Sequence, residues 1–257
     1  MTVLAQALTP RFRYESDLVA PLREQLPRLM FSARSQVDVE TFTEVPAVRG
    51  VPDLASIRFD NAAVSRRQEL GIRPLTTDVE VRAVLSLGQH PVSAADLAAR
   101  MRVSADYVRR AVIPLLVEQG WVVPTGKGMF VRAEGANPVM RRVVTVEAKL
   151  RDWHGALSQA RRQRLSADDA YIALESSAID AVGDELAYVA ESGIGIITVD
   201  ARRLKARIWA RPKRRLATVQ SAVGRMLIAE RCLEMLERGE REGKIYPVFG
   251  WTRPESS

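Results

Sequence analysis

Hydrophobic residues recur along the chain with two different periods, and the change between them predicts the fold class. Residues 13–30 carry leucine and valine at helical spacing, so we expect an amphipathic helix there. Residues 37–59 change to short β-branched runs around a glycine-containing turn, which predicts a hairpin of two strands. The first part of the chain therefore supplies one helix and two strands.

After residue 140 the pattern alternates between strands and helices. In order, it predicts a strand at 141–152, a helix at 153–166, a strand at 167–176, a helix at 178–192, strands at 193–200 and 203–210, and a long helix at 216–242. Strands that alternate with helices form a sheet with helices on its faces. We therefore expect an α/β core, with a mixed central sheet flanked by helices.

Residues 75–133 have a pattern of their own. Three short helical stretches, two of them with Ser93 and Ser104 as caps, are followed by two short strands around a "TGKG" turn. Three helices and a hairpin within about sixty residues are typical of a winged helix-turn-helix. We therefore predict a core in two parts, 1–73 and 137–257, with an inserted winged-helix domain at 74–136.

The charge of the chain suggests the kind of partner. The net charge is +7 and the pI is about 10.0, which favours a polyanionic partner, most commonly nucleic acid. Basic residues gather on and beside the expected recognition helix, in the expected wing turn, in the helix after residue 153 and in the run 201–215. The residues that we expect to contact DNA are Arg102, Arg109, Arg110, Lys127, Arg161, Arg162, Lys213 and Arg214.

Several other classes of protein are excluded by what the sequence lacks. No apolar run approaches the roughly 18 residues of a membrane span, and the first residues do not have the pattern of a secretory signal. One cysteine, Cys232, allows no internal disulfide, and with two histidines it leaves no cluster for zinc. We expect a cytoplasmic protein without a membrane partner.

A polar pair interrupts the strand at 141–152. Glu147 and Lys149 follow a β-branched run, and because strand side chains alternate, both point to the same face. One carboxylate alone binds Mg²⁺ poorly, but Asp53, at the start of the second hairpin strand, is placed to join them. The same spacing in "REGK", at 241–244, lies in a polar stretch without a strand pattern, so we assign it no function.

The motif "VPD" (51–53) followed by "VEAK" (146–149) resembles the PD-(D/E)XK nuclease superfamily. The resemblance covers roughly residues 10–60 and 140–210, and it includes an acidic residue, Glu15, on the first helix. In some branches of that superfamily a glutamine on the helix after the E-x-K strand lies near the metal, which points to Gln159. The two motifs are usually closer together, but a long surface insertion adds little loop entropy.

The resemblance implies a metal-dependent DNA endonuclease. Asp53 and Glu147, with the backbone carbonyl of Ala148, would form part of a Mg²⁺ or Mn²⁺ shell. Lys149 would orient or deprotonate the attacking water, or offset charge on the phosphorane, and Glu15 would add a water-mediated contact to the metal. The expected product of DNA cleavage carries a 5′-phosphate. Duplex DNA is the first substrate to expect, and cutting both strands favours a homodimer, a partner subunit or sequential nicking.

The residues also allow other functions. The pair of Glu147 and Lys149 could be a surface ion pair on an edge strand, or belong to a fold that has kept no activity. Glu15 could be solvated or complement the helix dipole, and Gln159 could be an ordinary surface residue. Many winged-helix modules contact proteins instead of DNA. The chain would then be a non-catalytic DNA-binding regulator or adaptor, or a subunit of a defence or repair complex that cuts only with a partner.

Overall fold

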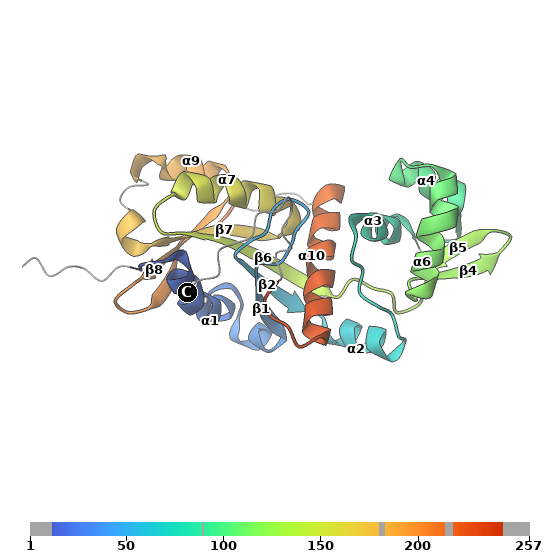
Figure 1. Cartoon of the computed structure of the whole chain (residues 1–257), viewed down its shortest axis with the longest axis horizontal. Coiled ribbons are helices and arrows are strands. Elements are labelled where there is room, and N and C mark those ends of the chain that lie inside the picture. Colours follow the sequence, from blue (N-terminus) through green and yellow to red (C-terminus); the bar gives the residue numbers. More distant parts are fainter. Residues whose placement is uncertain (1–11, 89, 180–182, 214–217, 244–257) are drawn as a thin grey trace, which may run out of the picture.

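A mixed six-stranded sheet organises the larger part of the molecule (Figure 1). The computed structural model describes residues 12–88, 90–179, 183–213 and 218–243. In spatial order, the strands are β1 (Val39–Thr43), β2 (Leu54–Phe59), β6 (Met140–Lys149), β7 (Asp169–Glu175), β8 (Gly195–Asp200) and β9 (Lys205–Ala210). The strands β6, β7 and β8 are parallel, and the other neighbours are antiparallel. The predicted α/β core with a mixed, helix-flanked sheet is confirmed.

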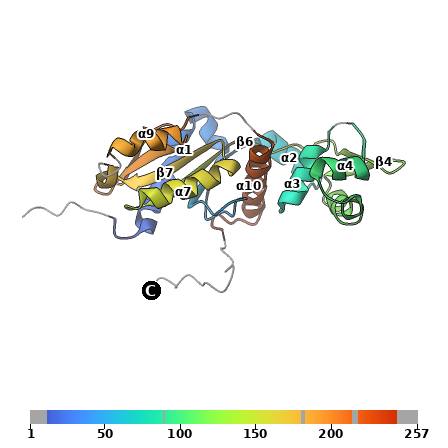
Figure 2. The same ribbon diagram turned by 90° about the horizontal axis from the view of Figure 1, so that it is seen from above.

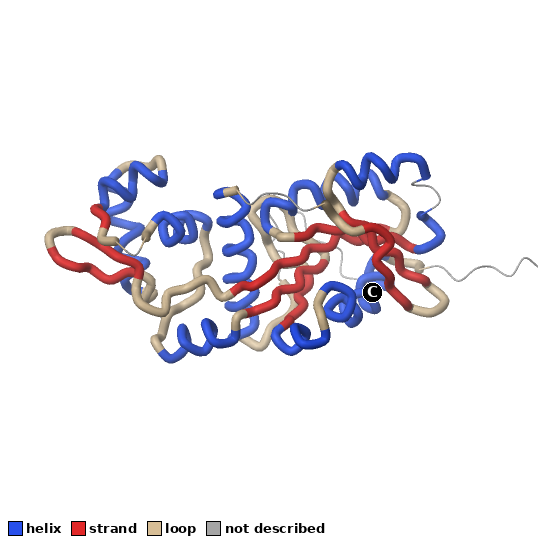
Figure 3. The backbone as a smooth tube through the Cα atoms, turned by 180° about the vertical axis from the view of Figure 1, so that it is seen from behind, coloured by secondary structure: helices blue, strands red, loops and turns tan. Residues whose placement is uncertain are grey.

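Helices cover both faces of this sheet (Figures 1 and 3). They are α1 (Glu15–Met30), α7 (Trp153–Gln163), α9 (Leu186–Glu191) and α10 (Val219–Glu237), while α2 (Asn61–Glu69) follows β2. Short 3-10 turns lie at Ala33–Asp38, Arg164–Ser166, Ser176–Ala178 and Gly183–Glu185. The leucines of α1 pack against Val144, Val146 and Ala148 of β6, and α7, α9 and α10 pack on the opposite face. Because strand residues alternate, Glu147 and Lys149 belong to the face covered by α7.

A smaller part carries a second sheet, of three strands in the order β3-β5-β4. Its elements are α3 (Asp78–Ser86), β3 (Val92–Ser93), α4 (Ala94–Met101), α5 (Ala105–Tyr107), a π-helical turn at Val108–Val112, α6 (Ile113–Glu118), β4 (Val122–Gly126) and β5 (Met129–Arg132). The two predicted caps are present, since the side chains of Ser93 and Ser104 accept backbone N–H groups of Asp96 and Tyr107. The division of the chain at residues 74 and 136 stays a prediction.

The helix α10 lies between the two sheets (Figure 2). Its residues Val223 and Met226 belong to the apolar core of the smaller part, whereas Ile228 and Cys232 pack against the large sheet. One helix therefore contributes to two hydrophobic cores. No helix in the described ranges has the length and apolar character needed to cross a membrane.

A buried ion pair holds this junction together. Arg67 of α2 donates to both carboxylate oxygens of Glu230 on α10, at 2.7 Å each, and the two side chains are 1% and 0% exposed. The Arg67 guanidinium also lies 4.4 Å from the ring centre of Trp121, whose indole N–H donates to the Arg73 carbonyl at 2.7 Å. Trp121 is thus a core residue.

Candidate active site

The loop before β2 and the end of β6 meet at one end of the large sheet. Leu54 pairs with Val146 in the antiparallel ladder, so Asp53 lies one position further on, beside Glu147. The Asp53 Oδ2 atom accepts a hydrogen bond of 2.7 Å from the backbone N–H of Ala148. Since the N–H and C=O of one strand residue point to the same side, the Ala148 carbonyl also faces the Asp53 side of β6.

Lys149 connects this group to α1. Its Nζ atom donates to Glu15 Oε2 at 2.8 Å and lies 3.8 Å from Glu147 Oε1. The start of α1 is fixed by Asp17, whose carboxylate accepts the backbone N–H of Tyr14 at 2.9 Å, and Glu15 therefore projects from the first turn. Three separate segments thus bring together the predicted carboxylates and the predicted lysine.

A glutamine that the sequence did not single out binds the central carboxylate. Gln163 Nε2 donates to Glu147 Oε2 at 2.6 Å. The predicted Gln159 lies one turn earlier on the same face of α7, and the Oε1 atoms of both glutamines are buried without a hydrogen-bond partner. The helix α7 runs antiparallel to β6. The rise of about 6 Å from Gln163 back to Gln159 therefore has the same direction and nearly the same length as the distance from Glu147 to Lys149. Gln159 is therefore level with Lys149 and makes no described contact with Glu147.

The site holds more negative charge than its surroundings compensate. Burial raises the pKa of Glu147 to about 7, and the charge of Asp53 adds to this rise. Burial also raises the pKa of Asp53, against the effect of its hydrogen bond from Ala148. Burial lowers the pKa of Lys149, but the hydrogen bond to Glu15 and the nearby carboxylates outweigh it, so the pKa rises overall. Such a pair of carboxylates would be stabilised by a further cation.

The available ligand atoms suit a hard divalent cation that keeps part of its water. Within the described ranges, no group of three or more His, Cys, Asp or Glu side chains is placed to hold a metal. Asp53, Glu147 and the Ala148 carbonyl offer oxygen atoms only. Mg²⁺ typically binds through one or two carboxylates, with water and substrate oxygens completing its shell. These residues therefore fit Mg²⁺ or Mn²⁺ better than a closed protein cage.

A pocket of about 410 Å³ opens beside Glu15. Arg13 and Arg151 line it, together with Glu175, the last residue of β7. Glu175 is only 4% exposed, yet its carboxylate makes no hydrogen bond or ion pair with any residue that the structure describes. Sequence reasoning missed these three residues. Their only signal is position, since they lie next to the first turn of α1 and the carboxyl ends of β6 and β7.

The predicted DNA contacts of the smaller part lie on its surface, at the other end of β6. Arg109 and Arg110 both pair with Asp106, at 2.6 and 3.1 Å. Arg102 ends α4 with a φ of 57°, and Lys127 lies at the tip of the β4–β5 turn with a φ of 52°. The seven residues of β6 before Glu147, 140–146, lie between this part and the site and span roughly 23 Å.

Two further predicted contacts lie on α7. Arg161 lies over the ring of Tyr188, 4.6 Å from its centre, and donates to the Tyr188 hydroxyl at 2.8 Å. Arg162 donates to the hydroxyl of Ser158 at 3.1 Å. Both arginines are exposed on the surface, and the structure does not bring them to the carboxylate site.

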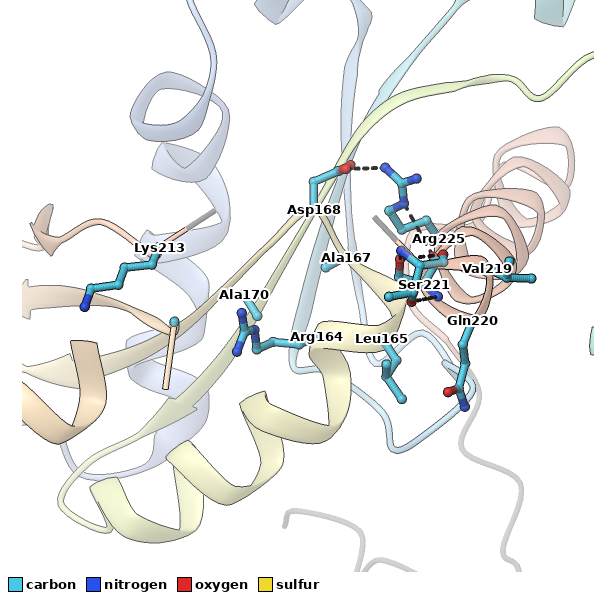
Figure 4. Close-up of a pocket in the computed structure, with 12 residues that line it drawn as sticks. Arg164, Leu165, Ala167, Asp168, Ala170, Lys213, Val219, Gln220, Ser221 and Arg225 are labelled. Atoms are coloured by element: carbon cyan, nitrogen blue, oxygen red, sulfur yellow. Dashed lines mark hydrogen bonds and ion pairs between the residues drawn. The ribbon is translucent and has the colours of Figure 1, made fainter. Parts of the chain in front are cut away.

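One further predicted contact, Lys213, lies at the other end of the sheet. Lys213 lines a pocket of about 460 Å³ with Arg164 and Arg225, where β7 begins and α10 starts (Figure 4). Arg225 pairs there with Asp168. Arg214 lies outside the described residues, so its predicted role has no structural description.

Comparison with known proteins assigns no family to the chain. No protein-family model matches the sequence, and no curated protein is similar to it.

Proposed function

We propose that the chain is a metal-dependent nuclease of the PD-(D/E)XK type, which hydrolyses phosphodiester bonds of DNA. The observation that carries this proposal is the meeting of Asp53, Glu147 and Lys149 from two distant segments, with a carboxylate pair that lacks full charge compensation. The order of hairpin, E-x-K strand, helix and parallel strand supports the same assignment.

Each polar residue has a distinct role in this proposal. Asp53, Glu147 and the Ala148 carbonyl would hold Mg²⁺ or Mn²⁺, which polarises the phosphodiester and lowers the pKa of a bound water. Lys149 keeps its proton at neutral pH, because its pKa is raised above the ordinary value by the hydrogen bond to Glu15 and the carboxylates around it, against the effect of burial. A protonated lysine stabilises negative charge on the phosphorane, so we favour this role over deprotonation of water.

We further assign the smaller part as an inserted winged-helix domain that holds duplex DNA. Its three helical segments followed by the β4–β5 hairpin support this assignment. Arg102, Arg109, Arg110 and Lys127 would contact backbone phosphates, which position DNA without reading its sequence. The part of β6 before Glu147 alone spans roughly 23 Å, so these contacts lie well away from the candidate active site. Cleavage is therefore expected at a distance along the duplex from these contacts.

Cleavage assays with Mg²⁺ or Mn²⁺ on plasmid, duplex, single-stranded DNA and RNA test the proposal. Asp53→Asn, Glu147→Gln and Lys149→Ala should each lower the cleavage rate by at least about 100-fold while DNA binding persists. Glu69→Gln, at an exposed carboxylate paired with Arg66 on α2, is the matched control and should cleave normally. The proposal fails if the wild type nicks none of these substrates, or if Lys149→Ala cleaves at the wild-type rate. Metal-independent DNA binding without cleavage would favour a non-catalytic regulator or adaptor.

A further inference from the structure

The edge strand β9 separates small apolar residues from exposed basic ones. Ala206 and Ile208 pack toward α1, whereas Lys205 and Arg207 are exposed. Side chains two residues apart share one face of a strand, so both cations project from the face opposite α1. Neither makes a hydrogen bond or ion pair with any part of the chain that the structure describes.

The cations gather around a small pocket at the start of β9. Arg203, Lys205, Arg207 and Asp200 line this pocket, whose volume is about 180 Å³. Asp200 is the acidic member, and Arg203 pairs with it at 3.7 Å. One carboxylate facing three cations leaves this surface positively charged.

An exposed aromatic ring lies on the same strand. Trp209 is 48% exposed. The β8–β9 register shifts at this position, because Ile208 pairs with Ile197 and Ala210 pairs with Ile196, so Trp209 has no partner in the ladder. A bulge of this kind redirects a side chain out of the regular strand.

The pocket lies at the same end of the sheet as the candidate active site, whereas Trp209 lies further along β9, level with the start of β8. The strands β6, β7 and β8 are parallel, so their last residues, including Lys149 and Asp200, share one end. Three strand spacings separate β6 from β9, which is about 14 Å. A nucleic acid strand that leaves the site across β7 and β8 would reach β9 within a short length.

We infer that the β9 surface, made of Arg203, Lys205, Arg207 and Trp209, binds an unpaired strand of nucleic acid beside the active site. Cations that contact phosphates, together with an aromatic ring on which a base stacks, form the usual binding surface for single strands. The inference rests on the proposed function, because it takes nucleic acid as the substrate. It adds that one strand of the substrate is unpaired close to the scissile bond.

Pairing with a second copy of the chain is the other possible use of an edge strand. Gln25 of α1 already occupies part of this edge, since it accepts the Ala206 N–H at 3.0 Å and donates to the Leu204 carbonyl at 2.7 Å. Lysine and arginine on an edge strand also repel an identical strand. The charge therefore favours a polyanion as the partner of β9 over a second copy of the chain. Repulsion between copies would explain the cations but not the exposed indole of Trp209.

The test measures binding of a labelled oligothymidylate and of a labelled duplex by fluorescence anisotropy in EDTA, so that cleavage plays no part. Trp209→Ala should weaken single-strand binding by about 5- to 150-fold, which corresponds to the 1–3 kcal/mol of one base–aromatic stack. Trp209→Phe should retain most of the affinity, and duplex binding should hardly change. For the double variant Lys205→Ala/Arg207→Ala, the plot of log K against log salt concentration should be less steep by about 1.4, because two phosphate contacts are lost. Arg66→Ala, at an exposed arginine of α2, is the control and should behave as wild type.

Three results would overturn the inference. They are wild-type protein that does not bind the single strand, unchanged affinity in Trp209→Ala, and an unchanged salt dependence in the double variant. If the double variant instead changes the oligomeric state in sedimentation, with strand binding intact, β9 is an interface between copies and the inference is wrong. Failure of the nuclease proposal appears separately, as a loss of the cleavage difference between wild type and Lys149→Ala.

Discussion

Replacing Glu147 with glutamine should stabilise the metal-free protein at alkaline pH. The folded protein raises the pKa of this carboxyl from 4.5 to about 7, first by burial and then by the charge of Asp53. Between these two pH values the folded protein binds the proton more tightly than the unfolded chain does, so the free energy of unfolding falls as pH rises. The difference of about 2.5 pKa units corresponds to about 3 kcal/mol above pH 7. Glutamine mimics the protonated acid and does not lose this stability.

Urea denaturation in EDTA at about pH 4 and about pH 8.5 measures the effect. Wild type and Glu147→Gln should differ little at the lower pH, and the variant should be more stable by about 3 kcal/mol at the higher pH. Glu69→Gln keeps Glu147 and changes only an exposed carboxylate, so it should lose as much stability between the two pH values as the wild type does. Adding Mg²⁺ should then stabilise the wild type and not the variant, since a ligand that binds only the folded state raises its stability. Equal stability of both proteins at the higher pH would refute this view of the site.

Three further outcomes follow from single contacts. Glu230→Gln leaves the Arg67 guanidinium buried without its counter-charge, so the free energy of unfolding, measured in urea, should fall by about 3–5 kcal/mol. A loss below about 1 kcal/mol, which is typical of exposed ion pairs, would contradict this. Gly224→Ala places a Cβ 2.0 Å from the Leu165 carbonyl oxygen, so α10 must shift, at a cost of about 1–3 kcal/mol in the same assay; unchanged stability would show that the helix moves freely. Gln163→Leu removes a hydrogen bond that lowers the pKa of Glu147. The acid limb of the pH–rate profile of metal-dependent cleavage should therefore move to higher pH, and an unmoved limb would show that Gln163 does not tune Glu147.

Much of the sheet and of its polar group follows from strand periodicity. The β-branched run before Glu147 predicts a strand, and the two-residue spacing predicts that Glu147 and Lys149 share a face, as they do. The place of Asp53 at the start of the hairpin's second strand also agrees with the observed register beside β6. Local pattern suffices here because a strand fixes both the direction and the spacing of its side chains.

The glutamine on α7 shows where sequence reasoning stops. Gln159 and Gln163 are four residues apart, so any helix places both on one face. Which of them meets Glu147 depends on how far α7 is displaced along β6, and that follows from packing around residues such as Trp153 and Ala160. No local signal in the sequence contains that displacement.

The buried ion pair of Arg67 and Glu230 could not be predicted from the sequence either. The segment that forms α2 has little apolar character, so its pattern predicts no helix there, and its buried residue is Arg67. The partner of Arg67, Glu230, lies 163 positions later on a helix predicted for its apolar residues. A buried arginine becomes favourable only when a distant carboxylate meets it, so neither residue reveals the pair by itself.

The place of α10 in two cores has a consequence for dissecting the molecule. If residues 74–136 were removed, the α10 face that holds Val223 and Met226 would lose its apolar neighbours and face water. If the chain ended before α10, both hydrophobic cores would lose the apolar residues that α10 contributes to them. Neither part is therefore expected to fold as a smaller protein unless α10 is redesigned. For the same reason, amide exchange should report one slowest unit that includes α10 and residues from both sheets.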